Sequence, residues 1–135
     1  MNLLLDTHTL LWSLFEPKKL SSKVRTTISN RSNRSNRIYV SNISLWEISL
    51  KYAIKKLSLN NIQPDALPEK ILESGFEFLE DSSNVFASFY KLPVISHADP
   101  FDRLIIWQAI SNDMILISKD THFKEYGSFG LQILW

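Results

Sequence analysis

The chain has 135 residues, of which 44% are hydrophobic and 21% are charged, and its formal net charge is +1. This composition is typical of a globular protein and excludes disordered, collagen-like and low-complexity classes. The length suits one domain over residues 1–135. Because the chain has no cysteine, disulfides, thiolate metal sites and a cysteine nucleophile are also excluded.

We expect a soluble, cytoplasmic protein with no membrane partner. No segment approaches the roughly 18 apolar residues of a membrane span, and no basic signal-peptide region precedes the first apolar run. Charge is unevenly distributed: residues 18–56 contain ten basic residues and one acid, whereas residues 65–81 contain six acids and one basic residue. The basic segment has two interpretations, a surface that binds a polyanion or a solvated surface with charges matched to helix ends.

Short apolar runs alternate with amphipathic segments along the chain. We expect strands at residues 3–5, 38–40, 76–79, 114–117 and 131–134. Helices are expected at 9–15, 21–29, 42–57, 65–73, 82–90 and 99–111, with a short one near 121–126. The tract 31–37 has no apolar residue and predicts a solvated loop. The alternation predicts an α/β fold, a three-layer α/β/α sandwich around a mostly parallel sheet of about five strands.

Five acidic residues are expected at one end of this sheet. Asp6 directly follows the first strand, and Asp120 follows the fourth strand after two intervening residues. Glu47 lies early in the helix after the second strand, and Asp99 and Asp102 begin the helix before the fourth. Because the carboxyl ends of parallel strands meet at one edge of the sheet, where ligands bind, we expect these acids to lie near one another.

Clustered carboxylates predict a cation site. Two carboxylates about 4 Å apart repel by roughly 4 kcal/mol at an effective dielectric of about 20, so a cluster needs raised pKa values or bound cations. Oxygen ligands favour Mg²⁺ or Mn²⁺, as one or two ions, and such ions suit phosphoryl chemistry. Each acid also has a purely structural interpretation, as a turn residue, a helix cap or a first-turn acid that favours the helix dipole.

Four sequence blocks resemble the motifs of PIN domains, in particular toxins of the VapC type from prokaryotic toxin–antitoxin pairs. The blocks are residues 3–12 (LLLDTHTLLW), 42–48 (NISLWEI), 97–105 (HADPFDRLI) and 116–123 (LISKDTHF). A single block is unspecific, but the four occur in family order and extend over almost the whole chain. The resemblance therefore identifies the whole chain as similar to this family.

The resemblance implies a PIN-like fold and an endoribonuclease that depends on Mg²⁺ or Mn²⁺, forms a homodimer and is inhibited by a cognate antitoxin protein. Matched by motif, the catalytic and metal-binding acids are Asp6, Glu47, Asp102 and Asp120. Asp99 is the additional acid of one subfamily, and it either assists the metal or only caps its helix. The expected reaction is hydrolysis of an RNA phosphodiester, leaving 5′-phosphate and 3′-hydroxyl ends.

Further residues are candidates for accessory roles. Thr7 either bonds a neighbouring carboxylate or metal-bound water, or simply continues its turn. Arg103 either contacts a phosphate as a bidentate donor or pairs with an acid of the site. The candidate contacts to the RNA backbone are the basic residues Arg31, Arg34, Arg37, Lys51, Lys55 and Lys56. The alternative for these six is a solvated surface.

Other functions compete with this one. A non-catalytic RNA-binding or interaction module would use the acids only as helix caps. A haloacid-dehalogenase-type phosphatase would also place an aspartate after the first strand, but its second acid corresponds to His8 here. A metal-free ribonuclease using His97 and His122 would leave the acids unexplained. DNA also remains a possible substrate, since metal chemistry at phosphorus does not need a 2′-hydroxyl.

Overall fold

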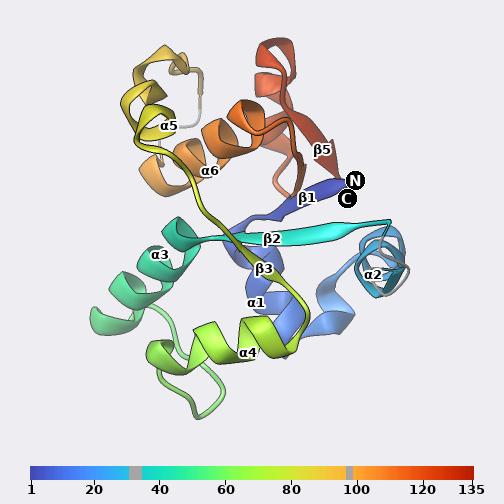
Figure 1. Ribbon diagram of the computed structural model, residues 1–135. Helices are drawn as coiled ribbons and strands as arrows, with labels where there is room; N and C mark the ends of the chain where they lie inside the picture. Colours follow the sequence, from blue (N-terminus) through green and yellow to red (C-terminus); the bar gives the residue numbers. More distant parts are fainter. Residues whose placement is uncertain (31–34, 97–98) are drawn as a thin grey trace.

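The computed structural model describes residues 1–30, 35–96 and 99–135. Within these ranges, five strands form one sheet in the order β3-β2-β1-β4-β5, and every neighbouring pair is parallel (Figure 1). The strands are β1 (Asn2–Leu5), β2 (Arg37–Ser41), β3 (Glu77–Leu79), β4 (Ile115–Ile117) and β5 (Gln132–Leu134). The predicted parallel sheet is confirmed.

Helices cover both faces of the sheet. The first group is α1 (Thr7–Phe15), η1 (Pro17–Lys19), α2 (Ser22–Ser29), α3 (Asn42–Ala53), η3 (Pro64–Ala66) and α4 (Leu67–Glu73). The second is α5 (Ser83–Ala87), η4 (Phe89–Lys91), α6 (Pro100–Ser111) and η5 (Thr121–Phe129). Figure 1 shows α1, α2 and α4 on one side of the sheet and α5 and α6 on the other. This is the predicted α/β/α sandwich.

The central strand β1 joins the two hydrophobic cores. Leu3 and Leu5 pack in a cluster with residues of α1, α2 and α4, whereas Leu4 packs in a second cluster with residues of α6 and η5. All three leucines are completely buried. Successive side chains of a strand point to opposite faces, so a strand covered on both faces is apolar at every position. This explains why residues 3–5 form an uninterrupted apolar run.

The direction in which the chain adds strands changes between β1 and β4. From β1 the chain builds outward through β2 and β3, and then returns to add β4 and β5 on the other side. Asp6 directly follows β1, and its N–H donates to the carbonyl of Ile117 at the end of β4, with 3.2 Å between nitrogen and oxygen. The segments after β1 and β4 therefore lie together at the topological switch point, where parallel sheets bind ligands.

Two helices end earlier than expected. α3 ends at Ala53 rather than near residue 57, because Lys55 adopts a positive φ of 61° and closes the helix without glycine or proline. The helix expected over 82–90 ends at Ala87 and continues as a 3₁₀ turn. The indole N–H of Trp107 donates to the carbonyl of Val85 at 2.9 Å, which is a tertiary contact that local sequence does not reveal.

Other element boundaries differ by small amounts. Asp6 caps α1, which therefore begins at Thr7 rather than Thr9. The expected loop at 31–37 ends before Arg37, which begins β2, and residues 31–34 lie outside the described residues. None of the helices in the described ranges combines the length and the hydropathy needed to cross a membrane.

A buried hydrogen bond ties β2 to α6. The hydroxyl of Ser41, at the end of β2, donates to the Gln108 side-chain oxygen at 2.6 Å, and both residues are buried. We expect Ser41→Ala to lower the free energy of unfolding by about 1–3 kcal/mol, because a buried acceptor loses its donor. Urea denaturation measures the effect. Ser49→Ala, at an exposed position of α3, is the matched control, and equal losses in both variants would contradict this assignment.

Candidate active site

Asp6 is held in a buried, hydrogen-bonded position between β1 and α1. Its side chain is the N-cap of α1 and accepts from the Thr9 N–H at 2.8 Å. The residue is only 5% exposed, and this burial raises the pKa of its carboxyl group, while hydrogen bonds from Ser118 and Thr9 act in the opposite direction. A nearby cation would favour the ionised form of such a desolvated carboxyl group.

Asp99 and Asp102 lie in the first turn of α6. Asp99 is the N-cap and accepts from the Asp102 N–H at 3.0 Å, and Pro100 occupies the first helical position. This is a common device for starting a helix, because proline lacks the N–H that would otherwise be unsatisfied there. The capping role predicted for Asp99 is therefore present, and it leaves one of its two carboxylate oxygens outside the cap.

Asp120 reaches the same region from the segment after β4. It is the N-cap of η5, and its Oδ1 accepts from the His122 N–H at 2.9 Å. Asp6, Asp102 and Asp120 line one cavity of about 270 Å³. The remaining residues of its wall are His8, Trp12, Lys119 and Phe123. Three of the predicted acids, from three separate elements, are thus brought to one open space.

Glu47 lies beside this group in a closed hydrogen-bonded arrangement. Its side chain is 4% exposed, and one carboxylate oxygen accepts from the Thr7 hydroxyl at 2.6 Å. The other oxygen contacts the Lys51 ammonium group at 2.5 Å. Because Thr7 directly follows Asp6, this network connects Glu47 to the cavity wall. It also raises the pKa of Lys51, mainly through the hydrogen bond to Glu47.

The acids approach one another without forming a closed set of metal ligands. In the described part of the chain, no three histidine or acidic side chains converge tightly enough to hold an ion as they stand. The donor chemistry still fits a hard divalent cation, because the cavity acids offer only oxygen and one of them is a desolvated carboxylate. Lys51 already supplies a positive charge to Glu47.

Arg103 does not line the cavity. Its guanidinium donates to the Leu92 carbonyl at 2.8 Å and lies 4.9 Å from the centre of the Phe89 ring. These contacts hold η4 against α6. The phosphate contact and the acid pair considered for Arg103 from the sequence stay predictions.

Arg37 lies away from the acids. It begins β2, at the opposite end of the strand from the acids, and its guanidinium donates to both oxygens of Glu77 on β3 at 2.9 and 2.7 Å. The hydrogen bonds between the two side chains raise the pKa of Arg37 and lower the pKa of Glu77, because they favour the charged form of each group. This bidentate pair gives Arg37 a cross-strand role that the sequence did not suggest.

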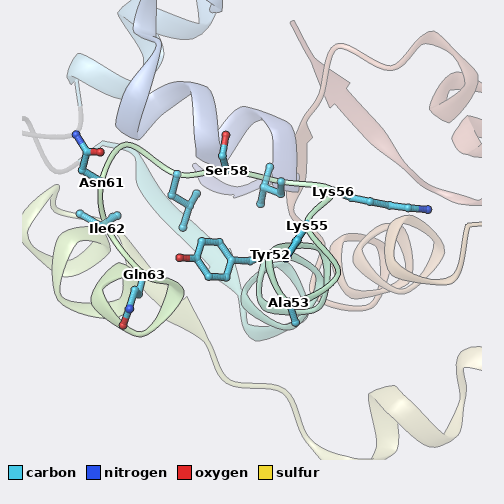
Figure 2. Close-up of a pocket in the computed structure, with 10 residues that line it drawn as sticks. Tyr52, Ala53, Lys55, Lys56, Ser58, Asn61, Ile62 and Gln63 are labelled. Carbon is cyan, nitrogen blue, oxygen red and sulfur yellow. The ribbon is translucent and has the colours of Figure 1, made fainter.

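The other predicted basic contacts have different positions. Lys55 and Lys56 are exposed just after the end of α3, in the wall of a separate open hollow that residues between 52 and 63 line. Figure 2 shows the Lys56 side chain extending away from the Tyr52 ring at the centre of this hollow. The hollow has no acidic residue in its wall. Arg31, Arg34 and His97 lie outside the described residues.

Sequence reasoning missed several residues of the site. Ser118, which bonds Asp6, follows β4 at the same sheet edge, and that placement was a usable signal. The spacing of Glu47 and Lys51, four residues apart on one helix, also predicts an ion pair. Lys119 lines the cavity and lies 5.9 Å from the Trp12 ring centre. No local pattern distinguished it from other exposed lysines.

Comparisons with known proteins agree with this geometry. The sequence matches the PIN domain family over residues 3–128. Similar solved structures include VapBC2 from Rickettsia felis bound to a promoter DNA fragment (19% identity, TM-score 0.69, 99% of this chain and 98% of that chain covered). DNA-bound VapBC from Salmonella typhimurium is also similar (20%, 0.68, 99% and 97%).

VapBC-1 from nontypeable Haemophilus influenzae has the same fold (20% identity, TM-score 0.65, 99% of this chain and 97% of that chain covered). At such identities these structures show a shared fold alone. A comparison with curated proteins found no match. The family match covers more than nine tenths of the sequence, including the segments that carry all five acids. The chain therefore belongs to the PIN-domain family.

Proposed function

We propose that this protein is a metal-dependent endoribonuclease that hydrolyses RNA phosphodiesters, and that it is the toxin of a toxin–antitoxin pair. The observation that carries the proposal is the cavity lined by Asp6, Asp102 and Asp120 at the switch point of a PIN-family sheet. Acids used only as helix caps would not need to share one cavity. This arrangement favours a nuclease over a non-catalytic binding module.

Mg²⁺ or Mn²⁺ is the cofactor that the donor set fits. Asp6, Glu47, Asp102 and Asp120 would hold it, with Asp99 as an additional acid beside them. Bound there, the ion would supply positive charge for the phosphate and lower the pKa of a water molecule. The donor set favours a hard ion, because every candidate ligand atom is a carboxylate oxygen and the chain has no cysteine.

The side chains have distinct roles in this proposal. Asp6 is fixed by the Thr9 N–H and by Ser118, so its carboxylate orientation is set before substrate arrives. Thr7 holds Glu47 in place through one hydrogen bond. Lys119 is exposed in the cavity wall and is suited to contact an RNA phosphate. Lys55 and Lys56 are further candidates for backbone contacts.

The proposed partners follow from the family and from its similar structures. The similar structures are VapBC complexes, which supports a cognate antitoxin for this chain. We further propose that the protein acts as a homodimer in the cytoplasm. Co-purification with an antitoxin encoded beside it, and light scattering of the isolated protein, test the two assemblies separately.

Metal removal tests the proposed reaction. End-labelled structured RNA is incubated with purified protein and Mg²⁺ or Mn²⁺, with EDTA in parallel lanes and DNA of matched sequence as a second substrate. We expect EDTA to lower the cleavage rate at least about 100-fold, because the ion supplies several kcal/mol of transition-state stabilisation. Product ends should be 5′-phosphate and 3′-hydroxyl. Cleavage unchanged by EDTA, or ends bearing a 2′,3′-cyclic phosphate, would overturn the proposal.

Thr7 gives a test of how Glu47 is positioned. We expect Thr7→Val to lower the cleavage rate about tenfold, because one buried hydrogen bond to a charged group is lost. Thr7→Ser keeps the hydroxyl and should retain most of the activity. A Val variant that is as active as the wild type, or a Ser variant as impaired as the Val variant, would show that the hydroxyl does not act through Glu47.

A further inference from the structure

Glu47 has no free carboxylate oxygen in this structure. Oε1 accepts from the Thr7 hydroxyl at 2.6 Å, and Oε2 contacts the Lys51 ammonium group at 2.5 Å. An ion that binds Glu47 must therefore share or replace one of these two partners. Since a carboxylate this deeply buried is costly to leave without a counter-charge, the ion pair with Lys51 stabilises the metal-free site.

The two partners differ in how readily they can leave. Thr7 is 5% exposed and is fixed in the first turn of α1 directly behind the β1 strand. The Lys51 side chain is 37% exposed and has a flexible four-carbon stem that reaches Glu47 from the solvent side of α3. A change of rotamer can release its ammonium group to water, whereas the hydroxyl of the buried, β-branched Thr7 side chain has no comparable path to water.

Lys51 also lies within the influence of the other acids of the site. The hydrogen bond to Glu47 is the main cause that raises the pKa of Lys51, and the charges of Asp99 and Asp102 act in the same direction with smaller effects. The ammonium group therefore pairs directly with the acid of α3 and lies within electrostatic range of the two acids at the start of α6. A divalent cation bound there would also stabilise the negative charge of these acids, with two positive charges instead of one.

We propose that Lys51 is an internal counter-cation that competes with the divalent ion for Glu47. It keeps the metal-free site neutralised and folded, and it lowers the affinity for the ion, which replaces it at Glu47. The exchange is ionic only: Lys51 stays protonated and its ammonium group moves to solvent. This inference rests on the proposed metal dependence, and it gives Lys51 a role different from the RNA-backbone contact expected from the sequence.

Mn²⁺ binding tests this competition without relying on catalysis. Free Mn²⁺ is quantified by electron paramagnetic resonance for the wild type, Lys51→Gln and Lys55→Gln at equal ionic strength. Lys55→Gln removes one exposed charge two residues beyond the end of the same helix and controls for general electrostatics. We expect Lys51→Gln to bind Mn²⁺ about tenfold more tightly than the wild type, and Lys55→Gln to change the affinity less than twofold.

Thermal unfolding supplies the second readout. The melting temperature of metal-free Lys51→Gln should be lower than that of the wild type, and its increase on saturation with Mn²⁺ should be larger. In a Glu47→Gln background, Lys51→Gln should no longer tighten Mn²⁺ binding, because the contested carboxylate is gone. If Lys51→Gln does not fold, the ¹H–¹⁵N signal of the Lys51 ammonium group in the wild type should shift on Mg²⁺ addition.

The outcomes separate the two proposals. Mn²⁺ binding by the wild type, with Lys51→Gln binding equally or more weakly, would overturn the role of Lys51 and leave the metal-dependent nuclease standing. An ammonium signal of Lys51 that Mg²⁺ does not shift has the same meaning. If the wild type binds no Mn²⁺ at millimolar concentration, the metal dependence fails, and the competition at Glu47 fails with it.

Discussion

Asp6→Asn and Asp102→Asn should each lower RNA cleavage at least about 100-fold, the largest functional effect that we expect from single substitutions. The two carboxylates line the cavity from different places, Asp6 from the junction of β1 and α1 and Asp102 from α6, so each is an independent part of the proposed ion site. Losing one charged ligand removes several kcal/mol of transition-state stabilisation. The measurement is the initial rate of cleavage of end-labelled RNA at saturating Mn²⁺.

Folding must be checked beside these rates. Asn keeps the size of Asp and its oxygen, so the cap on the Thr9 N–H is retained in Asp6→Asn. Because burial disfavours the ionised Asp6 carboxyl, we expect the melting temperature of metal-free Asp6→Asn to equal or exceed that of the wild type. Asp113→Asn, an exposed position at the turn before β4, is the control for both measurements. Full activity in both cavity variants would place the cleavage elsewhere or in a contaminant.

Leu4→Ala should have the largest effect on stability. Leu4 is completely buried in the central strand and packs in the cluster that joins β1 to α6 and η5. We expect the free energy of unfolding to fall by about 2–5 kcal/mol, because the substitution removes buried apolar surface and leaves a cavity. Urea denaturation followed by tryptophan fluorescence measures the change.

Leu72→Ala is the matched control for Leu4→Ala. Leu72 lies on α4 and is 57% exposed, so the same substitution there should change the free energy of unfolding by less than about 0.5 kcal/mol. If the two variants lose similar amounts, the cluster around Leu4 is not the closely packed core described above.

The sheet was predictable because its signal is local. Residues 3–5 and 114–117 are apolar at consecutive positions, which is the pattern of strands covered on both faces. The early end of α3 was not predictable, because no glycine or proline marks the positive φ of Lys55. Near the end of α5 at Ala87, the carbonyl of Val85 accepts from the Trp107 indole 22 residues away, a contact that local sequence does not show.

The acids of the site were predictable for a topological reason. In a parallel sheet, acids that follow the strands or begin the connecting helices meet at one edge, and Asp6, Asp102 and Asp120 do share a cavity there. The roles of the basic residues were not predictable in this way. A long side chain such as Arg103 or Arg37 reaches several partners, and only the packed structure decides which one it contacts.

The sequence by itself determined the PIN-type α/β architecture, the family and the acids that gather at one sheet edge. Hydrophobic periodicity and short motifs are local patterns of consecutive residues, so they can be recognised without the structure. Tertiary structure alone decided that the Thr7 hydroxyl bonds one oxygen of Glu47, and that Arg103 and Arg37 contact other groups. The physical reason is that each of these side chains can reach several partners. Folding decides which partner lies next to it, and the partners are distant in the sequence.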